Sequence, residues 1–256
     1  MKTGLCTIAF QNRSFEDVLD LAVSTGFDGV EPWGKPDHLP PDTSDEDVKL
    51  AASAIHSRGL GVSQFGSYAN PNSDDFEVQM EAALRIAKGL ETDDIRVWVG
   101  NNGSKEASQE EWDTAIRGFR TFCDKASDLG MTLVLEMHNK RLSDTAEGCF
   151  RLLEGIDCPN FKLNFQPIYT DTIEEMLATA RAVAPHVATV HAQNYQVKGK
   201  NSRSLVSEGV VDYGQIIPIF RKEGFDGYLE VEFVREHEPE ASLMADAAYL
   251  RSLCDG

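Results

Sequence analysis

The chain contains 256 residues, enough for one large domain with a buried core, and carries a formal net charge of −18 at pH 7. Hydrophobic residues make up 41% and charged residues 26%, which excludes neither a soluble enzyme nor a binding domain. The negative charge argues against nucleic acids and anionic membranes as partners, because phosphate groups would be repelled. A solvated acidic surface that improves solubility explains this charge, and a salt-rich habitat would produce the same bias.

The five cysteines are scattered along the chain without a Cys-x-x-Cys pair: Cys6, Cys123, Cys149, Cys158 and Cys254. This pattern is typical of neither a disulfide framework nor a zinc knuckle, and it predicts a reducing compartment. The first residues, MKTGLCTIAF, run directly into a strand pattern without the features of a signal peptide. No segment approaches the length of a transmembrane span. We therefore expect a cytoplasmic protein.

Along the chain, the apolar spacing alternates between the period of two typical of strands and the period of 3.6 typical of helices. Strands are predicted at residues 4–10, 29–32, 61–65, 95–99, 132–138, 161–166, 187–193 and 227–233. Helices are predicted at residues 14–25, 44–58, 74–90, 108–129, 144–154, 171–183, 213–223 and 239–253. Glycines directly after four of these helices are expected to end them: Gly26, Gly59, Gly130 and Gly224.

Strand–helix units that repeat in a chain of this length predict a (β/α)8 TIM barrel, a single α/β domain spanning residues 1–256. A doubly wound open sheet is the alternative, but it usually has a glycine-rich turn after its first strand. Here that turn reads AFQNRSFED. Irregular segments at residues 33–43, 66–73, 100–107 and 194–211 follow strands, at the end where a barrel builds its site.

Polar residues lie near the ends of several predicted strands. Glu136 in LVLEMH and His191 in ATVHAQN are surrounded by apolar residues and are expected to point into the barrel. A buried carboxylate needs a cation, which is either a metal ion or a neighbouring side chain such as Arg96 or Lys162. A carboxylate and an imidazole at strand ends on the same rim of a barrel favour a divalent transition metal.

The last predicted strand, GYLEVEF, places Glu230 and Glu232 on one face. Two carboxylates that close would raise the pKa of one of them unless a cation intervenes. We therefore expect Glu232 to bind metal and Glu230 to contact substrate or a neighbouring polar group. Trp33 and Trp98 at other strand ends are candidates for packing against a sugar ring, with ordinary barrel packing as the alternative. The basic stretch at residues 198–203 could bind a substrate phosphate or carboxylate, or be a solvated loop.

Several short segments together resemble the xylose isomerase-like TIM barrel family of sugar isomerases and epimerases. They are GFDGVEPW, IRVWVG, LVLEMHN, ATVHAQNY, SEGVVDYGQIIPIF and EGFDGYLEVEF, and they span nearly the whole chain. The resemblance implies one divalent metal ion, manganese in the first place, with magnesium, cobalt, zinc or iron as alternatives. By position, its ligands would be Glu136, Gln166, His191 and Glu232. The resemblance also implies a small-molecule sugar substrate and a possible homo-oligomer.

The chain departs from the family pattern at two strand ends. Gln166 and Tyr169 stand where relatives often have an Asp ligand and a His that contacts substrate, and Gln193 replaces a Lys. A Gln carbonyl oxygen can coordinate a hard cation but brings no charge, so the metal affinity should fall. We expect Tyr169, Gln193 and His138 to contact substrate.

The family chemistry implies an isomerase or epimerase that acts on a ketose or related keto-polyol. The metal would polarise the substrate oxygens, while Glu136 and Glu232 remove and return a carbon-bound proton through an enediolate. His138 would bind a hydroxyl group or relay a proton. Two alternatives stay open: a lyase or dehydratase of 3-keto-sugars or keto-inositols, and a metal-depleted sugar-binding barrel, which Gln166 motivates.

Overall fold

Parallel strands and helices alternate along the chain and close into the predicted barrel. The computed structural model describes residues 1–168, 170–200 and 202–255. Its strands are β1 (Lys2–Cys6), β2 (Gly29–Glu31), β3 (Gly61–Val62), β4 (Phe65–Gly66), β5 (Asp94–Val97), β6 (Thr132–Glu136), β7 (Phe161–Phe165), β8 (Val187–Ala192), β9 (Asn194–Tyr195), β10 (Arg203–Ser204) and β11 (Tyr228–Val231). Its helices are α1 (Phe15–Thr25), α2 (Asp45–Ser57), α3 (Phe76–Gly89), α4 (Gln109–Asp128), α5 (Ala146–Ile156), α6 (Ile173–Val183), α7 (Tyr213–Lys222) and α8 (Pro239–Asp255), with short 3-10 helices η1 (Thr7–Phe10) and η2 (Ala184–His186).

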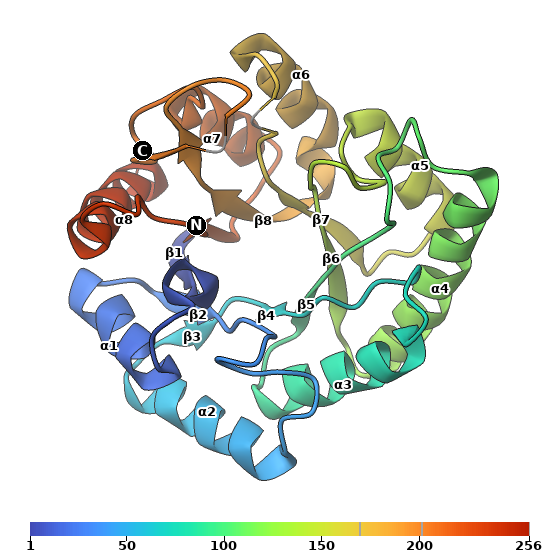
Figure 1. Cartoon of the computed structure of the whole chain (residues 1–256), viewed down its shortest axis with the longest axis horizontal. Helices are drawn as coiled ribbons and strands as arrows, with labels where there is room; N and C mark the ends of the chain where they lie inside the picture. The colour runs from blue at the N-terminus through green and yellow to red at the C-terminus, as the bar shows by residue number, and fades with distance from the viewer. Residues whose placement is uncertain (169, 201, 256) are drawn as a thin grey trace.

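The strands are hydrogen-bonded in the order β3-β2-β1-β11-β8-β7-β6-β5-β4. Because β3 and β4 are successive pieces of one chain segment, the sheet comes nearly full circle, and helices α1 to α8 surround it (Figure 1). The prediction of a TIM barrel is therefore confirmed. None of the described helices is long and apolar enough to cross a membrane.

Two predicted strands differ in detail. The first strand ends at Cys6 rather than at residue 10, because the chain turns into η1 at Thr7. The Thr7 hydroxyl accepts a hydrogen bond from the backbone N–H of Trp33, which holds this turn against the end of β2. The third is split into β3 and β4 by Ser63 and Gln64, whose side chains bond inside the barrel. This interruption places two polar side chains on the inner face.

Helix starts follow the capping signals in the sequence. Ser14, Ser44 and Ser108 each accept a hydrogen bond from the backbone N–H three residues later, which satisfies one otherwise unpaired donor. A full capping box forms at Thr172 and Glu175. Gly26 ends α1 in the left-handed conformation, as predicted.

Strand residues alternate between the apolar layer beneath the helices and a polar barrel interior. In β5, Ile95 and Val97 are buried in the hydrophobic core, whereas Arg96 between them reaches carboxylates of other strands. Glu31 follows Val30 in β2 in the same way. The period of two along each strand thus directs charged side chains toward the barrel axis.

Candidate active site

Three strand-end side chains meet at the carboxyl end of the barrel. Glu136 is the last residue of β6, His191 lies in β8, and Glu232 directly follows β11. One ligand atom from each lies within 4.8 Å of the others. His191 Nδ1 is 3.6 Å from Glu232 Oε1 and 4.0 Å from Glu136 Oε1, and it has no hydrogen-bond partner among the described residues. A buried nitrogen that faces two carboxylates suits a cation between them.

The Gln166 amide completes this cluster and can adopt two orientations. In one, its nitrogen donates to Glu136 Oε1 at 2.9 Å and to Glu232 Oε2 at 3.0 Å. In the other, the amide oxygen takes that position and faces the same two carboxylates. Acceptors so close to one another repel unless a cation lies between them, so a bound divalent ion would favour the second orientation. Glu136, Gln166, His191 and Glu232 therefore fit one divalent metal ion.

A second, fully buried layer holds the imidazole of His191. Its Nε2 lies 2.6 Å from Glu31 Oε2, while Arg96 Nε donates to Glu31 Oε1 at 2.6 Å. Arg96 also pairs with Glu136, so one guanidinium links both carboxylates. Burial opposes ionisation of Glu31, but Arg96 and His191 outweigh it and hold its pKa well below the usual range. Burial likewise opposes a charge on His191, yet Glu31 and Glu232 raise its pKa well above the ordinary value.

Glu230 lies deeper in the same interior, with a relative exposure of 0%. Burial, together with the charge of Glu31, raises the pKa of Glu230 to about 8. Its Oε1 is 2.5 Å from the Ser63 hydroxyl, which is also 3.1 Å from the backbone carbonyl of Val30. One hydroxyl hydrogen cannot serve both oxygens, and a proton on Glu230 would supply the missing one. Both observations favour a protonated, neutral Glu230 side chain at pH 7.

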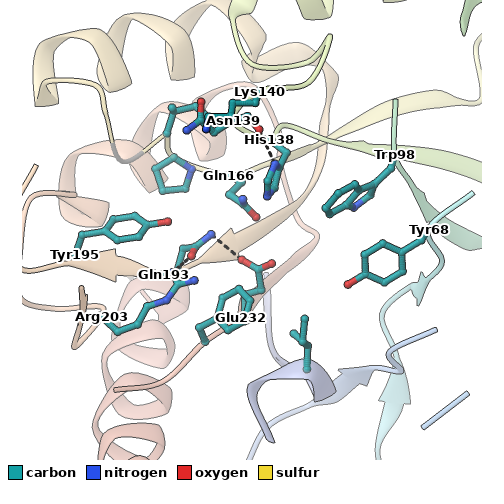
Figure 2. A pocket seen from close by; sticks show the side chains of 14 residues that line it. Tyr68, Trp98, His138, Asn139, Lys140, Gln166, Gln193, Tyr195, Arg203 and Glu232 are labelled. Atoms are coloured by element: carbon teal, nitrogen blue, oxygen red, sulfur yellow. Dashed lines mark hydrogen bonds between the residues drawn. The ribbon is translucent and has the colours of Figure 1, made fainter. Parts of the chain in front are cut away.

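Above the metal-binding cluster lies a pocket of about 380 Å³ (Figure 2). On one side, Trp98 donates through Nε1 to Glu136 Oε2 at 2.5 Å, and its ring lies 4.8 Å from the ring of His138. Tyr68 packs against Trp98 with ring centres 5.0 Å apart. Burial raises the pKa of Tyr68 to about 12, so its hydroxyl remains a hydrogen-bond donor at neutral pH.

The opposite wall comes from β8 and the hairpin β9–β10. Gln193 Nε2 donates to Glu232 Oε2 at 2.7 Å, and Arg203 donates to Gln193 Oε1 (Figure 2). The Asn194 side chain fixes the loop, because it bonds the backbone of Val206 and Val211. Arg203 itself lies in β10, where it pairs with Tyr195 of β9.

A family model described as xylose isomerase-like TIM barrel matches residues 19–253. The chain belongs to this family. The predicted family membership is therefore confirmed, and the barrel has the fold of a xylose isomerase-like protein.

Two curated relatives of this xylose isomerase-like chain are named dehydratases. A 3-dehydroshikimate dehydratase of Bacillus anthracis is 26% identical over 240 residues, covering 85% of this chain and 86% of the relative. An inosose dehydratase of Geobacillus thermodenitrificans is 23% identical, covering 99% and 97%.

Solved structures share the fold at lower identity. A probable 3-dehydroshikimate dehydratase from Bacillus anthracis has a TM-score of 0.82 at 23% identity, covering 98% of this chain and 99% of its own. A xylose isomerase-like protein from Mycobacterium smegmatis in complex with magnesium has a TM-score of 0.79 at 17% identity, covering 99% and 97%. A D-allulose 3-epimerase from Methylomonas has a TM-score of 0.78 at 16% identity, covering 99% and 98%.

The structure separates the predicted site residues into three groups. Those that line the pocket are Trp98, His138, Gln166, Gln193 and Glu232. Glu136 and His191 lie beneath it in the metal-binding cluster. Tyr169 lies outside the described residues.

Trp33 and Glu230 belong to the third group, because they are absent from the pocket lining among the described residues. Trp33 lies behind Tyr68 and donates through Nε1 to its hydroxyl at 2.7 Å. The Glu230 carboxylate is already bonded to Ser63 and Gln64. Trp33 thus packs within the barrel, and Glu230 contacts neighbouring polar groups, which were the alternatives to substrate contact for these two residues.

Sequence reasoning assigned no role in the site to Glu31 or Gln64. Glu31 stands in the segment GFDGVEPW, at a strand end like Glu136, and this position was the available signal. Gln64 follows a strand too short to show a period of two. Arg96 was expected only as an ion-pair partner of Glu136, a contact that the structure contains alongside the metal-binding cluster.

Proposed function

We propose that this protein is a divalent-metal-dependent dehydratase acting on a cyclic polyhydroxy ketone. The observation that carries the proposal is the asymmetry of the pocket. Glu232 lines it, whereas Glu136 is turned beneath it by Arg96 and Trp98. Epimerisation through two carboxylates needs a base on each face of the substrate, but an elimination needs only one base near the carbon that loses its proton.

His138 is the candidate for that base. Its Nδ1 lies 2.8 Å from the backbone carbonyl of Asn139, which can only accept a hydrogen bond. The neutral imidazole therefore carries its hydrogen on Nδ1, and Nε2 keeps the lone pair. The ring lines the pocket and packs on Trp98, so the base is held in a defined orientation.

The proposed reaction conserves all atoms and changes no oxidation state overall. His138 takes a proton from the carbon beside the substrate carbonyl, a hydroxyl group leaves the next carbon as water, and a carbon–carbon double bond forms. A bound divalent metal would act as a Lewis acid on the carbonyl oxygen. The Tyr68 hydroxyl and the Gln193 amide, which both line the pocket, would orient substrate hydroxyl groups. The protonated His138 can return its proton to the departing hydroxyl.

Both curated relatives bear names of dehydratases, which supports elimination over the isomerase or epimerase expected from the sequence. The epimerase activity remains the second candidate, because the fold is shared with a D-allulose 3-epimerase. The metal-depleted binding barrel is less well supported, since the His191 nitrogen and the two carboxylates converge despite Gln166.

The test compares three substrates with the manganese-, magnesium-, cobalt- and zinc-loaded protein: 3-dehydroshikimate, 2-keto-myo-inositol and D-allulose. Loss of water from 3-dehydroshikimate gives 3,4-dihydroxybenzoate, which is followed by its ultraviolet absorbance. Metal-dependent water loss from either of the first two, abolished in His138→Gln, supports the proposal. Epimerisation of D-allulose without any dehydration would replace it by the epimerase reading.

A further inference from the structure

The pocket lining carries positive charge that the proposed dehydration does not use. Two described residues of its lining carry a fixed positive charge, Lys140 and Arg203. This is unusual in a chain with a net charge of −18. Lys140 is exposed, whereas Arg203 is half-buried, with its guanidinium 4.0 Å from the ring centre of Phe233 and 5.2 Å from that of Tyr195. The two aromatic rings hold the planar group in place.

The hydrogen-bonding capacity of Arg203 is largely unused. One of its guanidinium nitrogens donates to Gln193 Oε1, and no carboxylate pairs with it among the described residues. A guanidinium has five N–H donors, so the remaining donors can form the two parallel bonds that bind a carboxylate. Because Gln193 also donates to Glu232, Arg203 is one side chain removed from the metal-binding cluster. A ring-sized molecule could reach both.

We propose that Arg203 is a specificity-determining residue that binds the carboxylate of the substrate. The pocket would then select a cyclic hydroxy-keto acid over a neutral keto-cyclitol or ketose. The inference rests on the proposed function for the hydroxy-ketone group of this substrate. Its carboxylate group is inferred from Arg203. Lys200 lies in the same basic loop, but it is exposed and absent from the described pocket lining. A substitution of Lys200 therefore removes a positive charge near the pocket without changing the described lining.

The first experiment measures binding rather than turnover. Calorimetry on the metal-loaded protein compares 3,4-dihydroxybenzoate with catechol, which lacks only the carboxylate. We expect the wild type to bind the acid about 10- to 100-fold more tightly. Arg203→Gln should remove this preference for the acid over catechol, Arg203→Lys should keep part of it, and Lys200→Gln should keep all of it. Equal affinities in the wild type, or a preference that survives in Arg203→Gln, would overturn the inference.

The second experiment separates the inference from the proposed function. In Arg203→Gln, the ratio of kcat/KM for 3-dehydroshikimate to kcat/KM for 2-keto-myo-inositol should fall about 10- to 100-fold, mainly through KM for the acid. Equal losses on both substrates would overturn the inference, because an effect through Gln193 is common to both molecules and only the acid has a carboxylate contact to lose. If neither compound is dehydrated while the binding preference still depends on Arg203, the proposed dehydratase is refuted and the carboxylate site stands.

Discussion

Glu31 lies beneath the metal-binding cluster, and we predict that Glu31→Gln weakens metal binding without contacting the metal. Its carboxylate receives hydrogen bonds from Arg96 and Gln64 and lies 2.6 Å from His191 Nε2. A metal ion bound at Nδ1 would displace the proton there, while this contact keeps a hydrogen on Nε2 and orients the Nδ1 lone pair toward the space between Glu136 and Glu232. A glutamine in its place must turn its NH2 group toward one of these donors, which frees the imidazole to exchange its tautomer.

The magnitude follows from the loss of one supporting contact. Removal of a partner that orients a metal-bound histidine costs about 10- to 100-fold in affinity, or about 1.4 to 2.7 kcal/mol. The amide also leaves one buried donor without an acceptor, which should lower the free energy of unfolding by about 1 to 3 kcal/mol. For a domain of this size, that corresponds to a decrease in Tm of roughly 2 to 10 °C.

Glu230→Gln is the matched control. Glu230 is as buried as Glu31, but its pKa is raised to about 8, so the substitution removes little charge at pH 7. Competition with a fluorescent chelator measures manganese affinity, and calorimetry measures Tm, for both variants. We expect a clear loss of affinity in Glu31→Gln and less than threefold change in Glu230→Gln. Equal effects in the two variants, or wild-type affinity in Glu31→Gln, would refute the assignment of Glu31 as the residue that orients His191.

Three further predictions concern the base, a buried carboxyl and the metal. His138→Gln should lower kcat of the dehydration by about 10²- to 10⁴-fold with a smaller change in KM, and an unchanged kcat in steady-state assays would exclude it as the base. Burial raises the pKa of Asp246 to about 7, so the folded protein binds the extra proton and its stability should fall as the pH rises from about 4 to 7. Denaturant unfolding measures this decrease in the free energy of unfolding, which should be about 2 to 4 kcal/mol in the wild type and absent in Asp246→Asn. Parallel pH profiles of the two proteins would contradict the assignment. Addition of manganese at about 100 times its Kd should stabilise the fold by about 2.7 kcal/mol, an effect that EDTA reverses, and a Tm insensitive to both would argue against the site.

The alternation of strands and helices was readable in the sequence because it depends on local spacing. The period of two and the period of 3.6 each act within a few residues, so they predicted eight units and a barrel. Boundaries were less accurate where tertiary contacts compete. Residues 61–66 form two short strands because Ser63 and Gln64 bond within the barrel instead of extending one continuous strand.

The sequence by itself also determined that Glu136, His191 and Glu232 would lie together, because parallel strands of a barrel end at one rim. Only the tertiary structure decided which side chain each of them contacts. Glu31 meets His191, 160 positions later in the chain, and no local pattern encodes a pairing over that separation. The reach of Arg203 into the pocket likewise depends on how β9 and β10 pair and on the rings beneath its guanidinium. Local periodicity specifies the strands and their inner faces, whereas hydrogen-bond partners in the barrel interior are fixed only when distant strands close around them.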